Sequence, residues 1–209
     1  MTRLLHIQGS PRGERSRSAN IAATFLARLA ERRPDLQVET LNVWQADLPA
    51  FAGPEIEARY AVLHGIPTSA EQAGAWAGVA VEAERFAGFD AYLVSTPMWN
   101  FGLPYRLKQY VDLITQPGAL FSATPEGQAF GALTGKRAWL IATSAWTCGP
   151  ESGVAHLDFQ ASYLRAWFGF CGIAELQAVL AAPMFGPQDV VEAAVARAKL
   201  QAEALADAV

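Results

Sequence analysis

Short, nearly continuous apolar runs alternate along the chain with longer segments in which apolar residues recur every three or four positions. The runs predict strands at residues 3–8, 37–43, 90–96, 136–143 and 174–182. The longer segments predict a helix after the first strand, with Ile21, Phe25 and Leu29 on one face, and further helices at about 69–86, 104–114, 157–170 and 188–208. A strand is thus followed by a helix five times.

This alternation predicts an α/β fold, a parallel sheet with right-handed crossovers and helices on both faces. The first, third and fourth strands are almost wholly apolar, as strands covered on both faces are. No repeat or linker interrupts the pattern, so residues 1–209 are expected to form a single domain, with irregular excursions at 48–68 and 118–135. Ligands of such sheets bind beyond the carboxyl ends of the strands. The loops after the first, third and fourth strands therefore matter most.

The first of these loops, residues 9–20, joins a buried strand to an amphipathic helix and carries Ser10, Ser16 and Ser18. A helix N-terminus favours an anion, and three hydroxyl groups can surround phosphate oxygens. The loop has neither the Gly-Lys-Ser/Thr of a Walker A motif nor G-x-G-x-x-G. It is typical of a monophosphate site. Helix capping accounts for the serines equally well.

The loop after the third strand, residues 97–104, contains Met98, Trp99 and Phe101 around Asn100. These side chains can form one wall of a flat heteroaromatic ring site, since the amide of Asn100 both donates and accepts hydrogen bonds. The alternative is that the aromatic rings fill the core.

The loop after the fourth strand, residues 143–150, adds hydroxyl groups and backbone donors at the same edge of the sheet. One monophosphate site and one aromatic wall with an amide fit FMN better than ATP, NAD or FAD.

Composition narrows the class of partner. Hydrophobic residues make up 52% of the chain and charged residues 17%, which predicts apolar surface covered by a partner subunit or a planar ligand. The net charge of -4 and the lack of a basic run argue against nucleic-acid binding. No signal-like segment or membrane-length apolar stretch is present, so a cytoplasmic protein without membrane attachment is expected.

The residues that commonly bind metals are few and scattered. Cys148 and Cys171 belong to no C-x-x-C pair and are interpreted as ordinary thiols. His6, His64 and His156 fall in different predicted elements without H-E-x-x-H spacing. No metal site is predicted.

Four segments together resemble the FMN-dependent NADH-azoreductases, also described as NADH:quinone oxidoreductases, of the flavodoxin-like superfamily. They are the serine loop, Pro97-Met-Trp-Asn-Phe101, Leu107-Lys-Gln-Tyr-Val-Asp-Leu113 and Tyr163-Leu-Arg-Ala-Trp-Phe-Gly-Phe-Cys-Gly172. The resemblance covers essentially the whole chain. It implies a flavodoxin-like three-layer sandwich with a five-stranded parallel sheet in the order 2-1-3-4-5. It also implies ping-pong hydride transfer from NADH through FMN to quinones and to azo compounds, which are cleaved to amines, with no catalytic side chain and with flavin N5 carrying the hydride.

The resemblance also assigns the cofactor-binding residues by position. Ser10, Ser16, Arg17 and Ser18 correspond to the phosphate site, and Met98, Trp99, Asn100 and Phe101 to the isoalloxazine wall. Arg17 stands where the family usually has Gln or a similar neutral residue. After the fourth strand, relatives commonly read Thr-Ser-Arg-Gly-Gly and this chain reads Thr143-Ser-Ala-Trp-Thr147. Ser144 keeps its place in that motif.

The resemblance further implies a homodimer with its active sites at the interface. Phe121, Phe130 and Trp167 are the candidate aromatic residues over the flavin, and for each a place in the core is the alternative. Trp146 is expected to narrow the substrate pocket and so to favour flatter or smaller acceptors.

Two other functions remain open on the same fold. One is an NAD(P)H-dependent FMN or chromate-type reductase, which differs only in its acceptor. The other is a flavodoxin-like electron carrier, for which a strongly acidic face and an open flavin edge are expected.

Overall fold

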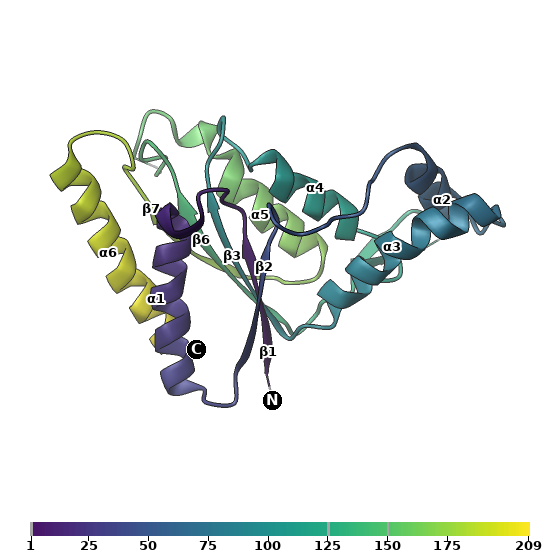
Figure 1. Cartoon of the computed structure of the whole chain (residues 1–209), viewed down its shortest axis with the longest axis horizontal. Coiled ribbons are helices and arrows are strands. Elements are labelled where there is room, and N and C mark those ends of the chain that lie inside the picture. The colour runs from purple at the N-terminus through teal and green to yellow at the C-terminus, as the bar shows by residue number, and fades with distance from the viewer. Residues whose placement is uncertain (1, 125, 150) are drawn as a thin grey trace.

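Five parallel strands form the centre of the molecule in a computed structural model that describes residues 2–124, 126–149 and 151–209 (Figure 1). The strands are β1 (Arg3–Gln8), β2 (Gln37–Asn42), β3 (Ala91–Pro97), β6 (Arg137–Thr143) and β7 (Leu176–Ala181). Their order is β2-β1-β3-β6-β7, which confirms the expected 2-1-3-4-5 sheet. Pro150, the last residue of the expected third loop, lies outside the described residues, as do Met1 and Pro125.

Helices cover both faces of this sheet (Figure 1). One face carries α1 (Arg17–Arg32) and α6 (Gln188–Asp207), and the other carries α3 (Ala70–Ala87), α4 (Tyr105–Ile114) and α5 (Phe159–Phe170). Phe25 of α1 and Ala202 of α6 pack with Leu93 of β3 in one core, whereas Phe86 of α3 and Leu164 of α5 belong to the other. Because the apolar stripe of each helix faces the sheet, the chain forms three layers.

The two excursions contain elements that the sequence pattern did not predict. Residues 48–68 include α2 (Gly53–His64), and residues 118–135 include the antiparallel pair β4 (Phe121–Ala123) and β5 (Ala129–Gly131). Of the residues in α2, only Ala58 and Ala61 are buried. A helix that buries two alanines and packs mainly on α3 has no apolar stripe for periodicity to detect.

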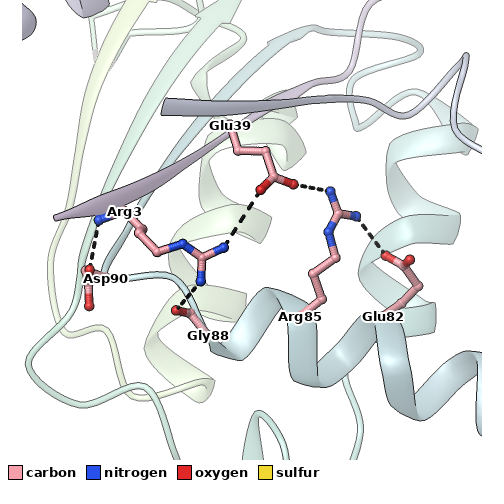
Figure 2. A network of polar contacts seen from close by, with 6 residues as sticks. All are labelled: Arg3, Glu39, Glu82, Arg85, Gly88 and Asp90. Atoms are coloured by element: carbon pink, nitrogen blue, oxygen red, sulfur yellow. Dashed lines mark hydrogen bonds and ion pairs between the residues drawn. The ribbon is translucent and has the colours of Figure 1, made fainter. Parts of the chain in front are cut away.

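A chain of polar contacts fixes the edge strand β2 at the end of the sheet where β1 begins (Figure 2). Arg85 of α3 contacts both Glu39 of β2 and Glu82 of its own helix. The guanidinium of Arg3 lies 3.8 Å from Glu39, and the backbone N–H of Arg3 donates to Asp90 at 2.8 Å. These side chains are partly exposed, so each pair adds little free energy. Together they connect the edge strand β2 to β1 and to α3.

His6 is a buried polar residue in the middle of the sheet. Its Nε2 lies 2.9 Å from the Oγ of Ser95 on the neighbouring strand, and 2% of the residue is exposed. Burial lowers the pKa of the imidazole to about 4, because the charged form has lost its water. The folded protein therefore holds His6 neutral.

We expect His6 to make the protein less stable in acid. In the unfolded chain the imidazole gains a proton near pH 6.5, while in the folded protein it stays neutral until about pH 4. Stability is therefore lost as the pH falls through this window, by about 3 kcal/mol in total. Urea unfolding at neutral pH and near pH 4 should show a smaller loss in His6→Gln than in the parent. His64→Gln, at an exposed position, serves as the control, and an equal loss in all three proteins would contradict the assignment.

Candidate functional site

A cavity of about 260 Å³ opens at the carboxyl edge of the sheet. Its lining comes from the loops after four strands: Ser10, Arg12, Ser16, Arg17 and Ser18 after β1, Pro97 and Met98 at the end of β3, Thr143, Ser144 and Ala145 after β6, and Met184 and Phe185 after β7. The three loops expected from the sequence thus converge on one space. The loop after β7 also lines this space, which was not predicted from the sequence.

The residues expected to bind a cofactor divide into two groups. The lining includes the four expected residues of the first loop, Met98 and Ser144. Trp99, Asn100 and Phe101 are not part of the lining; they continue the loop beyond Met98 and are exposed. The cavity and this exposed turn are adjacent parts of one edge.

Ser16 caps α1, and all three serines of the first loop line the cavity. The Oγ of Ser16 accepts a hydrogen bond from the N–H of Ala19 at 3.2 Å, which makes Ser16 the N-cap of α1. The Oγ atoms of Ser16 and Ser18 lie 3.2 Å apart, and both residues are buried. Capping uses only a lone pair of Ser16, and the contact between the two hydroxyl groups uses one of their two hydrogens, so the pair keeps one hydrogen to donate to an anion. The two interpretations of the loop are therefore compatible.

Gly9, the first residue of this loop, is held tightly against the end of β3. Its N–H donates to the carbonyl of Ser95 at 2.8 Å, and its carbonyl accepts from the indole of Trp44 at 3.0 Å. A Cβ at Gly9 would lie 2.8 Å from Oγ1 of Thr96 and 2.9 Å from Cδ2 of Leu107. Both neighbours are buried, so neither can give way. Only glycine fits at this position.

Gly9→Ala is expected to destabilise the protein by about 1–3 kcal/mol, as overpacking in a core does. The matched control is Gly74→Ala, on the exposed side of α3, where a Cβ meets no atom within 4 Å and should stabilise the helix by about 0.5–1 kcal/mol. Urea denaturation of the two variants and the parent measures both effects. Equal stability of the two variants would contradict the close packing of Gly9.

The turn after β3 has an unusual backbone. Trp99 and Gly102 exchange two backbone hydrogen bonds, and between them Asn100 and Phe101 have φ of 47° and 71°. Positive φ at both central residues is the pattern of a type I′ turn, which favours Asn and Gly and costs a bulky residue such as Phe about 1 kcal/mol. Such strain persists only where the surroundings enforce it, and it is concentrated at functional sites.

Neighbouring elements hold this turn in place. The N–H of Met98 donates to the carbonyl of Thr143 at 2.7 Å, and the N–H of Phe159 donates to the carbonyl of Phe101 at 3.0 Å. Asp158 caps α5, so the start of that helix is itself fixed. The backbone that carries Trp99, Asn100 and Phe101 is therefore held next to Met98, which lines the cavity.

Arg17 and Ser144 anchor the loop after β7. One guanidinium nitrogen of Arg17 donates to the carbonyl of Met184 at 2.8 Å, although the side chain is exposed. The N–H of Met184 donates to the carbonyl of Ser144 at 2.9 Å. The charge of Arg17 therefore lies at the cavity, and the loop after β7 closes one of its sides.

Trp146, in the loop after β6, is exposed to solvent. The hydroxyl of Ser144 donates to the carbonyl of Trp146 at 2.7 Å, and 59% of the indole residue is exposed. Burial raises the pKa of the nearby Cys148 thiol, which keeps it protonated.

The other expected pocket aromatics do not reach the cavity of their own chain. Trp167 is buried in the core and donates to Oγ1 of Thr115 at 2.9 Å, and Phe121 is buried against Phe170, with ring centroids 5.1 Å apart. Phe130 is exposed on the β4–β5 pair. Trp167 lies about 12 Å along α5 from the end that contacts Phe101. Within one chain, the structure thus gives Trp167 the alternative role, core packing.

Some residues at the site were not singled out from the sequence. Arg12 of the serine loop and Met184 and Phe185 after β7 line the cavity. Trp44, which follows β2, is outside the lining and donates to the carbonyl of Gly9. Because the carboxyl ends of all parallel strands share one edge, a search extended to the loops after the second and fifth strands would have found Trp44, Met184 and Phe185.

The described residues hold neither a metal-binding cluster nor a membrane-spanning helix. Residues 2–124, 126–149 and 151–209 contain no group of three or more metal-binding side chains of His, Cys, Asp or Glu. Within the same residues, no helix has the length and hydropathy needed to cross a membrane.

Residues 2–206 match a family model described as the flavodoxin-like fold. The FMN-dependent NADH:quinone oxidoreductase 2 of Pseudomonas syringae pv. tomato is 39% identical over 206 residues, which cover 99% of this chain and 98% of that protein. The FMN-dependent NADH:quinone oxidoreductase of Nitratidesulfovibrio vulgaris is 39% identical over 208 residues, 99% of each chain.

Solved structures agree on the fold. An azoreductase from Bacillus anthracis superimposes with a TM-score of 0.89 over 100% of both chains, at 24% identity. From the family model and the relatives, the chain belongs to the flavodoxin-like fold family and, within it, to the family of the FMN-dependent NADH:quinone oxidoreductases.

Proposed function

We propose that this protein is an FMN-dependent NADH:quinone oxidoreductase that also cleaves aromatic azo compounds to amines. One observation carries the proposal: a serine-lined helix N-terminus and a strained turn bearing an amide and two aromatic rings lie together at one cavity edge. Relatives 39% identical over nearly the whole chain carry the name of this activity. NADH is a cytoplasmic metabolite, which supports a cytoplasmic location.

The residues at the cavity suit FMN. Ser10, Ser16 and Ser18 present buried hydroxyl groups at the N-terminus of α1, and Arg17 adds a positive charge, so this end suits a phosphate. A cavity of about 260 Å³ is small for a whole cofactor, so the residues of the exposed turn 98–101 would hold the ring system. The serine end and the aromatic turn match the two chemically different ends of FMN.

When bound, FMN supplies the redox chemistry: it can accept a hydride from NADH and pass it to a quinone or an azo bond. The protein binds and orients the reactants. The amide of Asn100 both donates and accepts hydrogen bonds, and Trp99 and Phe101 offer flat surfaces for aromatic rings. His6 is buried, neutral and paired with Ser95, so it takes no part.

Ser16→Ala is expected to weaken FMN binding, and Ser69→Ala is its matched control. Both serines are N-caps, accepting from Ala19 at 3.2 Å and Gln72 at 3.1 Å, so each change costs about 1 kcal/mol of stability. Only Ser16 lies at the cavity. In steady-state NADH:quinone assays, the half-saturating FMN concentration should rise about tenfold in Ser16→Ala, for a lost charge-assisted hydrogen bond, and stay unchanged in Ser69→Ala.

The same assay tests the function. Turnover that requires FMN and gives parallel double-reciprocal lines for NADH and quinone supports the proposed ping-pong reaction. Turnover without FMN contradicts it. FMN binding without reduction of quinones or azo dyes favours an electron carrier instead.

We propose that the active protein is a homodimer, with each cavity completed by the partner subunit. Several large apolar side chains are exposed around the carboxyl edge: Trp99, Phe101, Tyr105, Trp146, Phe159 and Phe185. An exposed apolar patch of this kind supports an interface. Of the three expected pocket aromatics, Phe130 is exposed and is the one proposed to contact the flavin of the partner subunit, whereas Phe121 and Trp167 are buried in the core of their own chain.

Phe159→Asp is expected to shift the protein from dimer to monomer. Phe159 is exposed beside the turn at Phe101, and a carboxylate there opposes burial in an interface. Leu200→Asp, on an exposed position of α6, is the control. Sedimentation velocity compares the three proteins, and a monomeric parent would contradict the proposal.

Trp146 is proposed to limit the size of the acceptor. Its indole is exposed next to the cavity residue Ala145, where it can restrict access. In Trp146→Gly, kcat/KM for a bulky azo dye should rise about tenfold relative to that for a small quinone, because the larger acceptor gains the space that the indole occupies. Steady-state assays of both proteins with both acceptors measure the ratio, and an unchanged ratio would overturn this role.

A further inference from the structure

Trp44 connects the two halves of the candidate site. Its indole N–H donates to the carbonyl of Gly9 at 3.0 Å, at the start of the serine loop. Its ring lies against Trp99 and Tyr105, with centroid distances of 5.5 Å and 5.1 Å. One side chain from the edge of the sheet therefore contacts both the proposed phosphate end and the aromatic turn.

The backbone around Trp44 is firmly held. Arg106 of α4 donates through Nε to the carbonyl of Val43 and through Nη2 to that of Ala46, both at 2.9 Å. The N–H of Trp44 donates to Oδ1 of Asn42 at 3.0 Å. The indole thus projects from a braced turn.

We propose that Trp44 is a positioning residue for flavin binding, which fixes the serine loop and the aromatic turn at the separation that FMN spans. The inference rests on the proposed function. Trp44 is not part of the cavity lining, so it acts through Gly9 and Trp99 rather than on the ligand.

The two contacts of Trp44 can be removed separately. Trp44→Phe keeps an aromatic ring against Trp99 and Tyr105 but cannot donate to Gly9. Trp44→Ala removes both contacts. Trp139→Phe is the matched control, since Trp139 also donates one indole hydrogen bond, to Gln177 at 3.1 Å, and packs on Phe25 in the core between the sheet and α1.

The experiment measures dissociation constants for FMN and for riboflavin, which lacks the phosphate, by flavin fluorescence. Trp44→Phe should bind FMN about five- to tenfold more weakly, for one lost hydrogen bond, while riboflavin binding changes much less. Trp44→Ala should weaken the binding of both flavins. Trp139→Phe should bind both as the parent does, and melting temperatures establish that all variants are folded.

Three results would overturn the positioning role. They are an unchanged FMN affinity in Trp44→Phe, an equal loss of affinity for both flavins in that variant, and an equal effect of Trp139→Phe. If the parent protein binds no flavin, the proposed function and the positioning role both fail. If the parent binds FMN and one of these three results is found, only the positioning role fails.

Discussion

The contact of Gly9 with the end of β3 is the constraint on which the candidate site depends. Gly9 pairs with Ser95 on one side and accepts from Trp44 on the other, and a Cβ would meet Thr96 and Leu107 at less than 3 Å. The serine loop therefore starts from a fixed point, and Ser16, Arg17 and Ser18 at the start of α1 line the cavity. Parallel pairing of β1 with β3 brings the aromatic turn to the same edge.

The two ends of the sheet serve different purposes. At the end where β1 begins, charged residues of β1, β2 and α3 pair with one another and hold the edge strand (Figure 2). At the carboxyl end, the backbone is strained at Asn100 and Phe101, and large apolar side chains are exposed. Such local costs are characteristic of sites that bind a ligand or a partner.

The sequence predicted the parallel sheet and the convergence of three loops, because apolar strands and amphipathic helices have distinct periods. The strand order came from the resemblance to the family and not from periodicity. It did not reveal α2, which lacks an apolar stripe, or the short β4–β5 pair. At the site, the serines, Met98 and Ser144 could be located from motif and topology. The role of Arg17 as a tether to Met184 and that of Trp44 as a bridge depend on tertiary distances. The core position of Trp167 depends on how far along α5 it lies, which residue type alone does not fix.

The central claim is that this edge holds FMN in a form that NADH reduces and a quinone reoxidises. The most direct measurement is the visible absorbance of the FMN-loaded protein during anaerobic addition of NADH and then of a quinone. NADH should bleach the yellow colour, and a stoichiometric amount of quinone should restore it. A protein that takes up no FMN, or whose bound FMN keeps its colour when NADH is added, would contradict the account.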